Sequence, residues 1–237
     1  MKFLKITRMP VSLISGLLLL TMVWSCNSDK KTSNEQSATT AQSSTTATIE
    51  SAPAGKKVVL FYGNSLTAGY GVEQSEAFPA LVGEKIDSAG LDYTVVNAGL
   101  SGETTAGGKS RISWVMRQSV SVFVLELGGN DGLRGLPLAQ TRQNLQAIID
   151  TVRKKSPDAR IVLAGMQIPP NLGTEYTREF RELFKEVADK NSAVLIPFLL
   201  ENVGGVAKLN QPDGIHPTPA GHKIVANTVW SVLKPLL

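Results

Sequence analysis

VVLFYGNSLTAGYG, residues 58–71, joins a continuous apolar run to a glycine-rich turn. The run at 58–62 contains β-forming residues without polar alternation, which is typical of a strand buried on both faces of a parallel sheet. Four similar runs follow at 93–96, 120–127, 160–164 and 193–196. The sequence therefore predicts a mainly parallel sheet of five strands.

Helical periodicity separates several of these runs. Apolar residues recur at intervals of three and four at Leu145, Ile148, Ile149 and Val152, at Tyr176, Phe180, Leu183, Phe184 and Val187, and at Val225, Val229, Val232 and Leu233. Strands that alternate with helices predict an α/β fold, here a three-layer α/β/α sandwich. In such folds the functional residues collect in loops after the carboxyl ends of the strands.

The first 55 residues are predicted to be an export signal and a tether. Residues 1–8 are basic and residues 9–24 are largely apolar, which is the pattern of a secretory signal, with an uncleaved membrane anchor as the alternative. The sequence Ser25-Cys26 resembles the acylation site of bacterial lipoproteins, although Cys26 could be incidental beside ordinary cleavage. We therefore predict a signal peptide at 1–26, a disordered Ser/Thr-rich tether at 27–55 and a hydrolase domain at 56–237. The expected location is the bacterial cell envelope, periplasm or outer membrane, with a lipid anchor in the membrane.

Composition excludes several classes of protein. Three of the 24 basic residues lie in the predicted signal, and the other 21 are nearly balanced by 20 acidic residues. No basic stripe remains for binding nucleic acid. One cysteine and two histidines are too few for most metal sites, so we expect no metal and no cofactor. A mechanism that needs histidine must use His216 or His222.

Two segments far apart in the sequence could supply a nucleophile and its base. Ser65 follows the first predicted strand, at a turn where its hydroxyl could stand clear of the sheet or merely cap a helix. Asp213 lies three residues before His216, close enough for the carboxylate to hold one ring nitrogen while the other faces a serine. The alternative for this pair is a surface turn. His222 lies within the last helical segment, and we predict that it is structural.

Two glycine-containing loops could supply hydrogen-bond donors. The loop after the third predicted strand contains Asn130 behind two glycines, so its amide could reach an oxyanion. The loop after the second predicted strand contains Gly102, whose N–H could be a second donor. Each loop taken alone could also be a plain turn.

Together the four segments resemble the SGNH (GDSL) hydrolase family over the whole predicted domain. Residues 126–135 (ELGGNDGLRG) and 213–217 (DGIHP) are most similar to its periplasmic thioesterase, arylesterase and lysophospholipase branch. The resemblance implies a catalytic triad and three oxyanion donors: Ser65 as nucleophile, His216 as base and Asp213 as the acid that orients it, with the Ser65 N–H, the Gly102 N–H and the Asn130 side chain as donors. One position departs from the family, because Asn64 stands where its first block usually has Asp.

The resemblance implies a serine esterase acting on aryl esters, lysophospholipids or acyl thioesters through an acyl-enzyme. The segment after Asn130 is similar to the substrate loop of the thioesterase branch, with 166–174 as the opposite wall of the site. The expected substrate-binding residues are Leu133, Arg134, Gly135, Leu136 and Pro170. The partners are then a small acyl ester or lipid and the membrane, and the runner-up function is a carbohydrate O-acetylesterase. A lipoprotein that binds a ligand without turnover is a third hypothesis.

Overall fold

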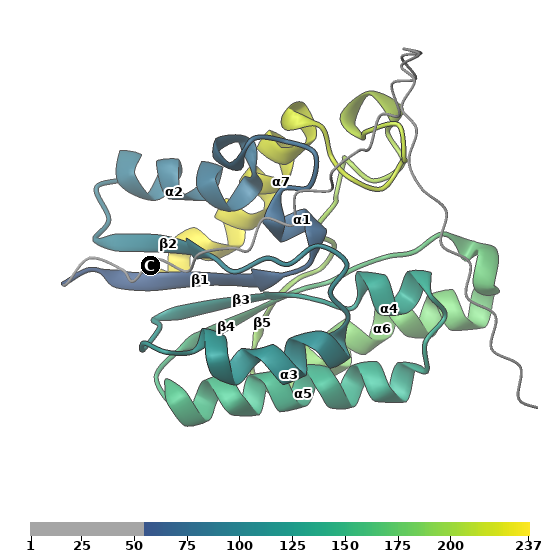
Figure 1. Ribbon diagram of the computed structural model, residues 1–237, viewed down its shortest axis with the longest axis horizontal. Helices are drawn as coiled ribbons and strands as arrows, with labels where there is room; N and C mark the ends of the chain where they lie inside the picture. The colour runs from purple at the N-terminus through teal and green to yellow at the C-terminus, as the bar shows by residue number, and fades with distance from the viewer. Residues whose placement is uncertain (1–54) are drawn as a thin grey trace, which may run out of the picture. The chain divides into compact units, whose positions relative to one another are not determined.

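The computed structural model describes residues 55–237, which contain a five-stranded parallel sheet (Figure 1). The strand order is β2-β1-β3-β4-β5. The strands are β1 (Lys57–Gly63), β2 (Tyr93–Asn97), β3 (Val122–Glu126), β4 (Arg160–Ala164) and β5 (Val194–Ile196). All five predicted strands are therefore confirmed, and so is the parallel sheet. The predicted signal, Cys26 and the tether up to residue 54 lie outside the described residues.

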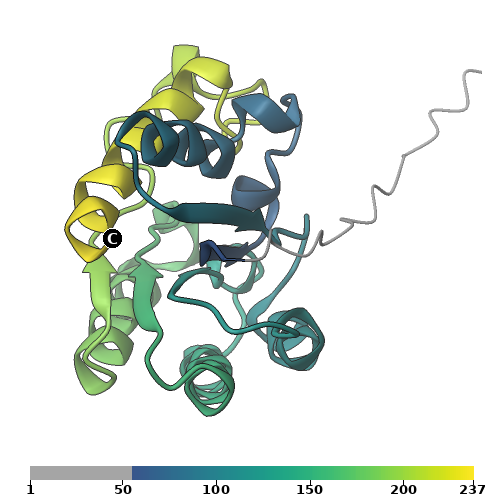
Figure 2. The same cartoon turned by 90° about the vertical axis from the view of Figure 1, so that its left-hand side faces the viewer.

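The three central strands, β1, β3 and β4, are buried almost throughout because helices cover both faces of the sheet. In Figure 1, α2 (Phe78–Ser88) and α7 (Pro219–Leu233) lie on one face, and α3 (Thr105–Val115), α5 (Leu138–Lys155) and α6 (Thr174–Lys190) lie on the other. Figure 2 shows the same two helical layers from the side. The chain moves from β1 to β2 in one direction and then back across β1 to β3, so right-handed crossovers place α2 and α3 on opposite faces. The predicted three-layer sandwich is confirmed.

The predicted helical periodicity corresponds to α5, α6 and α7. All four apolar residues of the first pattern are fully buried on α5. No helix within residues 55–237 is both long enough and apolar enough to cross a membrane.

Two longer helices, α2 and α3, were not identified from the sequence. The buried residues of α2 are only Phe78, Pro79, Val82 and Ile86, which form a sparse hydrophobic pattern. The buried face of α3 includes Gly108, where a Cβ would lie 2.3 Å from Leu127 Cδ1. Small residues let α3 approach the sheet closely, but they leave little hydrophobic pattern to recognise.

The remaining helices are short. They are α1 (Ser65–Ala68), α4 (Gly129–Leu133), η1 (Gln74–Glu76), η2 (Pro170–Leu172), η3 (Ala207–Leu209) and η4 (Lys234–Leu236). The segment around Asn130, expected to be a loop, thus contains one helical turn.

The strand order places the carboxyl ends of β1 and β3 side by side at the centre of the sheet. Gly63, the last residue of β1, pairs with Glu126, the last residue of β3. The chain leaves β1 toward β2 and leaves β3 toward β4, so the direction of winding reverses between these two strands, the place where open α/β sheets usually bind their ligands. Both the Ser65 turn and the Asn130 turn begin at this point.

Candidate active site

The Ser65 turn is tight because β1 passes directly into α1. The Asn64 side-chain oxygen caps α1 by accepting the Leu66 N–H at 2.9 Å. A Cβ at residue 63 would lie 2.1 Å from the Thr67 hydroxyl and 2.5 Å from a Glu126 carboxylate oxygen, so only glycine fits there. Ser65 is half-buried, at the carboxyl end of a central strand.

The structure brings Ser65, His216 and Asp213 together. His216 Nε2 lies 2.9 Å from Ser65 Oγ, although 151 residues separate them in the sequence. His216 Nδ1 lies 2.6 Å from Asp213 Oδ2. Asp213 Oδ1 also accepts the backbone N–H groups of Ile215 and His216, at 2.8 and 3.0 Å. The Asp213–His216 segment is therefore a compact turn that aims the imidazole at the serine.

Asp213 is ionised throughout the neutral range. Desolvation raises its pKa, but the backbone and side-chain hydrogen bonds from His216, with that from Ile215, outweigh this effect and lower the pKa to about 2. A carboxylate in this state accepts the proton on Nδ1 and leaves Nε2 as the acceptor that faces Ser65. The Tyr70 ring packs against the imidazole at a centroid distance of 4.6 Å and covers it.

The two expected donor loops contact each other. The Asn130 side chain, in the first turn of α4, donates to the Glu103 carbonyl oxygen at 3.0 Å. The Arg134 guanidinium donates to the Gly102 carbonyl oxygen at 3.3 Å. Within residues 55–237 the Gly102 N–H has no hydrogen-bond acceptor, so it is free to bind a ligand. The Asn130 amide retains a second N–H for the same purpose.

Charged residues that the sequence analysis did not assign hold these loops in place. The buried Glu103 forms an ion pair of 2.6 Å with Arg111, which also donates to the Ala98 carbonyl oxygen. The buried Asp131 accepts the N–H and the hydroxyl of Thr105, at 2.9 and 2.5 Å. Asp131 lies within the ELGGNDGLRG motif, directly after Asn130. This position was the one feature of the sequence that could have identified it.

The predicted substrate residues lie on two segments that contact each other. Leu133 is 42% exposed, and the Leu136 carbonyl oxygen accepts the Tyr176 hydroxyl at 2.8 Å. A Cβ at Gly135 would lie 3.5 Å from Leu172 in η2. Pro170 lines a cavity of about 240 Å³ with Gln167, Ile168, Thr174, Thr177, Arg178 and Arg181. The other four predicted residues are not among those that line it.

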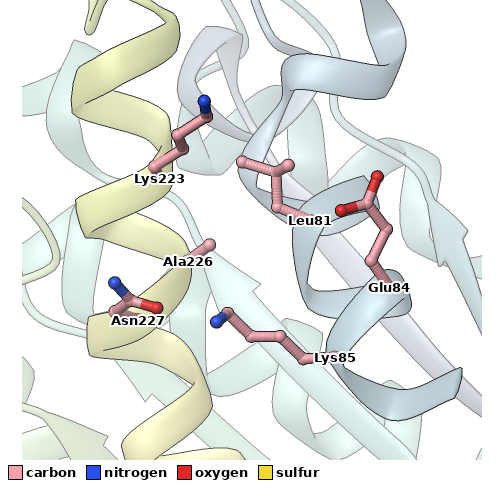
Figure 3. A pocket seen from close by; sticks show the side chains of 6 residues that line it. All are labelled: Leu81, Glu84, Lys85, Lys223, Ala226 and Asn227. Atoms are coloured by element: carbon pink, nitrogen blue, oxygen red, sulfur yellow. The ribbon is translucent and has the colours of Figure 1, made fainter. Parts of the chain in front are cut away.

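His222 makes no hydrogen bond to Ser65, Asp213 or His216. Its ring is buried against Phe78, and Nδ1 accepts the Phe78 N–H at 3.2 Å. This arrangement agrees with the structural role predicted for it. The cavity between α2 and α7, about 320 Å³, contains none of the predicted site residues; Leu81, Glu84, Lys85, Lys223, Ala226 and Asn227 line it (Figure 3). Within residues 55–237, no three His, Cys, Asp or Glu side chains are grouped as metal ligands would be.

The chain is similar in sequence and in structure to known proteins. The profile of the GDSL-like Lipase/Acylhydrolase family matches residues 61–224. The chain is 40% identical to esterase TesA of Pseudomonas aeruginosa, over 78% of this chain and 91% of the relative. It is 36% identical to thioesterase 1/protease 1/lysophospholipase L1 of Escherichia coli, over 78% and 86%. A crystal structure of TesA superimposes with a TM-score of 0.73 and 41% identity, covering 76% of this chain and all of that one.

Proposed function

Because the chain belongs to the GDSL-like lipase/acylhydrolase family and is a carboxylic ester hydrolase, we propose that Ser65, His216 and Asp213 are its catalytic triad. The observation that supports this most directly is the 2.9 Å distance between His216 Nε2 and Ser65 Oγ. A base within hydrogen-bonding distance of a hydroxyl can take its proton as the oxygen attacks.

The proposed reaction transfers an acyl group first to Ser65 and then to water. His216 Nε2 takes the Ser65 proton while Oγ bonds to the carbonyl carbon, and the Asp213 carboxylate stabilises the resulting imidazolium. His216 then gives that proton to the leaving alcohol or thiol, which departs as the carbonyl re-forms. Water attacks the acyl-enzyme by the same steps, with His216 again as the base, and the acid is released.

Three donors are proposed to hold the oxyanion of each tetrahedral intermediate. They are the Ser65 N–H, the Gly102 N–H and the Asn130 side chain, which belong to the segments after β1, β2 and β3. The hydrogen bond from Asn130 to the Glu103 carbonyl oxygen fixes the amide near Gly102. Donors held in place before the reaction stabilise developing charge without reorganising.

Replacing the nucleophile tests the triad. The Ser65→Ala variant should remain folded, hydrolyse no p-nitrophenyl butyrate above background and fail to react with a fluorophosphonate probe. The matched control is Ser88→Ala, which removes an exposed hydroxyl on α2 and should leave both signals unchanged. Hydrolysis by Ser65→Ala at the wild-type rate would refute the assignment.

The proposed substrates are esters and thioesters of short to medium acyl chains, including lysophospholipids. Leu133, whose apolar side chain is exposed, and Leu136 lie on one segment, which contacts η2 and α6. The acyl chain would lie between this segment and those two helices. Relatives named esterase and thioesterase/lysophospholipase support this class and do not favour the alternative of a carbohydrate O-acetylesterase. Nor do they favour a binding protein without turnover.

An acyl-chain profile tests the substrate proposal. We expect kcat/KM for p-nitrophenyl esters to rise from acetyl to hexanoyl or octanoyl, since each buried methylene contributes about 0.8 kcal/mol. Replacing Leu133 with Ser should weaken this dependence on chain length and leave acetyl ester hydrolysis nearly unchanged. A wild-type preference for acetyl over octanoyl esters would contradict the proposal.

We also propose that the protein is exported and anchored by acylation of Cys26. The basic segment at 1–8, the apolar segment at 9–24 and the placement of the chain's one cysteine directly after them support this proposal. Acyl chains on the cysteine would hold the enzyme at a membrane by burying their methylenes.

Metabolic labelling tests the anchor. Cells that express the full chain should incorporate radioactive palmitate into it, and the protein should sediment with membranes. Cys26→Ser should abolish both, whereas the control Ser25→Ala should retain both. Label in the Cys26→Ser protein, or an unlabelled wild type, would contradict this proposal.

A further inference from the structure

Glu126, the last residue of β3, is a buried carboxylate that lies beneath the nucleophile turn. It is 1% exposed and forms no ion pair with any other residue that the structure describes. One oxygen accepts the Asn64 N–H (3.1 Å), the Thr67 N–H (3.3 Å) and the Thr67 hydroxyl (2.8 Å). The other accepts the Asn64 side-chain amide at 2.7 Å. Hydrogen bonds from one turn therefore take the place of a cationic partner.

These bonds leave a single amide of the turn available. The N–H groups of Asn64 and Thr67 donate to Glu126, and the Leu66 N–H donates to the Asn64 side-chain oxygen. Between them, the Ser65 N–H has no acceptor within residues 55–237. The carboxylate thus satisfies the neighbouring donors on the inner side of the turn and leaves the donor that an oxyanion would need.

We propose that Glu126 is a positioning residue that works through the Asn64 amide to hold the nucleophile turn in its reactive shape. This inference rests on the proposed function, because Ser65 must be the nucleophile for its placement to matter. Glu126 does not touch the substrate. It fixes the backbone so that the Ser65 hydroxyl lies beside His216 while the Ser65 N–H stays free for an oxyanion.

The pairing of Asn64 with Glu126 has a defined polarity. The Asn64 nitrogen must face Glu126, because its oxygen already accepts the Leu66 N–H. In Glu126→Gln, the nitrogen of the new amide therefore faces either the Asn64 nitrogen or the three donors on the other side. Turning the Asn64 amide over would place two donors against each other at Leu66 instead. No arrangement satisfies every group.

Exchanging the acid and the amide should restore the pairing. In Asn64→Asp with Glu126→Gln, the new amide at position 126 donates through its nitrogen to the new carboxylate at position 64. The oxygen of the same amide accepts the three donors that Glu126 accepted, and the carboxylate at position 64 still caps Leu66. The exchange also gives residue 64 the acid that the family's first block usually has there.

The experiment compares kcat and KM for p-nitrophenyl butyrate in the wild type, Glu126→Gln and the exchanged double variant. We expect Glu126→Gln to lower kcat about 10–100-fold, with KM nearly unchanged, because the reacting groups are misplaced. The double variant should recover to within about threefold of the wild type, which makes the two substitutions strongly non-additive. Glu84→Gln, an exposed acid on α2, is the matched control and should behave as wild type.

Each outcome decides the inference. Wild-type kcat in Glu126→Gln, or a folded double variant no more active than Glu126→Gln, would overturn it. If Glu126→Gln does not fold, the double variant and Thr67→Val, which removes one donor, serve in its place. The first should then be active, and the second should lose about threefold or more in kcat; inactivity of the first or an unchanged kcat in the second would overturn the inference. The Ser65→Ala result separates this failure from failure of the triad itself.

Discussion

The buried His222 contributes a part of the protein's stability that depends on pH, and replacing it with Asn should remove that contribution. Desolvation, followed by the charge of His216, lowers the pKa of His222 to about 4 from an ordinary value of 6.5. Since Nδ1 accepts the Phe78 N–H, a second proton on the ring would have to displace this donor. The imidazole ring of His222 is therefore neutral in the folded protein.

The sign and size of the effect follow from proton linkage. A histidine whose pKa is depressed on folding stabilises the protein fully above pH 6.5, and this stability is lost as the pH falls toward 4. With the values 4 and 6.5, the wild-type free energy of unfolding should contain a loss of about 2 kcal/mol between pH 7.5 and pH 5 from this residue. In His222→Asn, the side-chain oxygen can accept the Phe78 N–H at either pH.

Urea unfolding at the two pH values measures this difference. His222→Asn should be less stable than wild type at pH 7.5, because a ring packed against Phe78 is lost, but its further loss at pH 5 should be smaller by about 2 kcal/mol. His216→Asn, a change at the chain's other histidine, should retain most of the wild-type loss. An equal loss in wild type and His222→Asn would refute the reasoning.

Three further predictions concern the active site and its support. Asn130→Ala should lower kcat for p-nitrophenyl butyrate about 10²–10³-fold through the loss of one oxyanion donor, and an unchanged kcat would exclude it from that role. Asp213→Asn should lower kcat by more than about 100-fold while leaving fluorescence-detected folding intact, because an amide that donates to Nδ1 would stabilise the wrong tautomer; near-normal turnover would contradict this. Gly99→Ala would place a Cβ 2.3 Å from the backbone of α1 and should lower the free energy of unfolding, measured by thermal denaturation, by about 2 kcal/mol or more. In the control Gly83→Ala the new Cβ would make only ordinary contacts, so the free energy of unfolding should not fall.

The strands and the position of Ser65 were predictable because two simple rules act together. Apolar runs without alternation mark strands buried on both faces, and parallel strands bring their carboxyl ends to one edge. Ser65 and Asn130 each follow such a run and therefore had to lie near that edge. Asp213 and His216 were placed by chemistry instead, because a serine needs a base and the chain has only two histidines.

The supporting carboxylates were not predictable from the sequence. Glu126 and Glu103 are buried, but the sequence does not distinguish a glutamate whose side chain points into the protein from one on the surface. Their positions depend on which donors the fold brings to them, from Asn64 and Thr67 in one case and from Arg111 in the other. The helix α3 was missed for a related reason, since Gly108 marks a close approach that only its neighbours in space reveal.

The central claim is that acyl transfer passes through the Ser65 oxygen, and trapping the enzyme tests it most directly. After reaction with a fluorophosphonate, peptide mapping by mass spectrometry should find one phosphonyl group on the peptide that contains Ser65 and none on the Ser65→Ala protein. The label should form much more slowly in His216→Asn. A stoichiometric adduct on any other residue, with Ser65 unmodified and esterase activity abolished, would contradict the account.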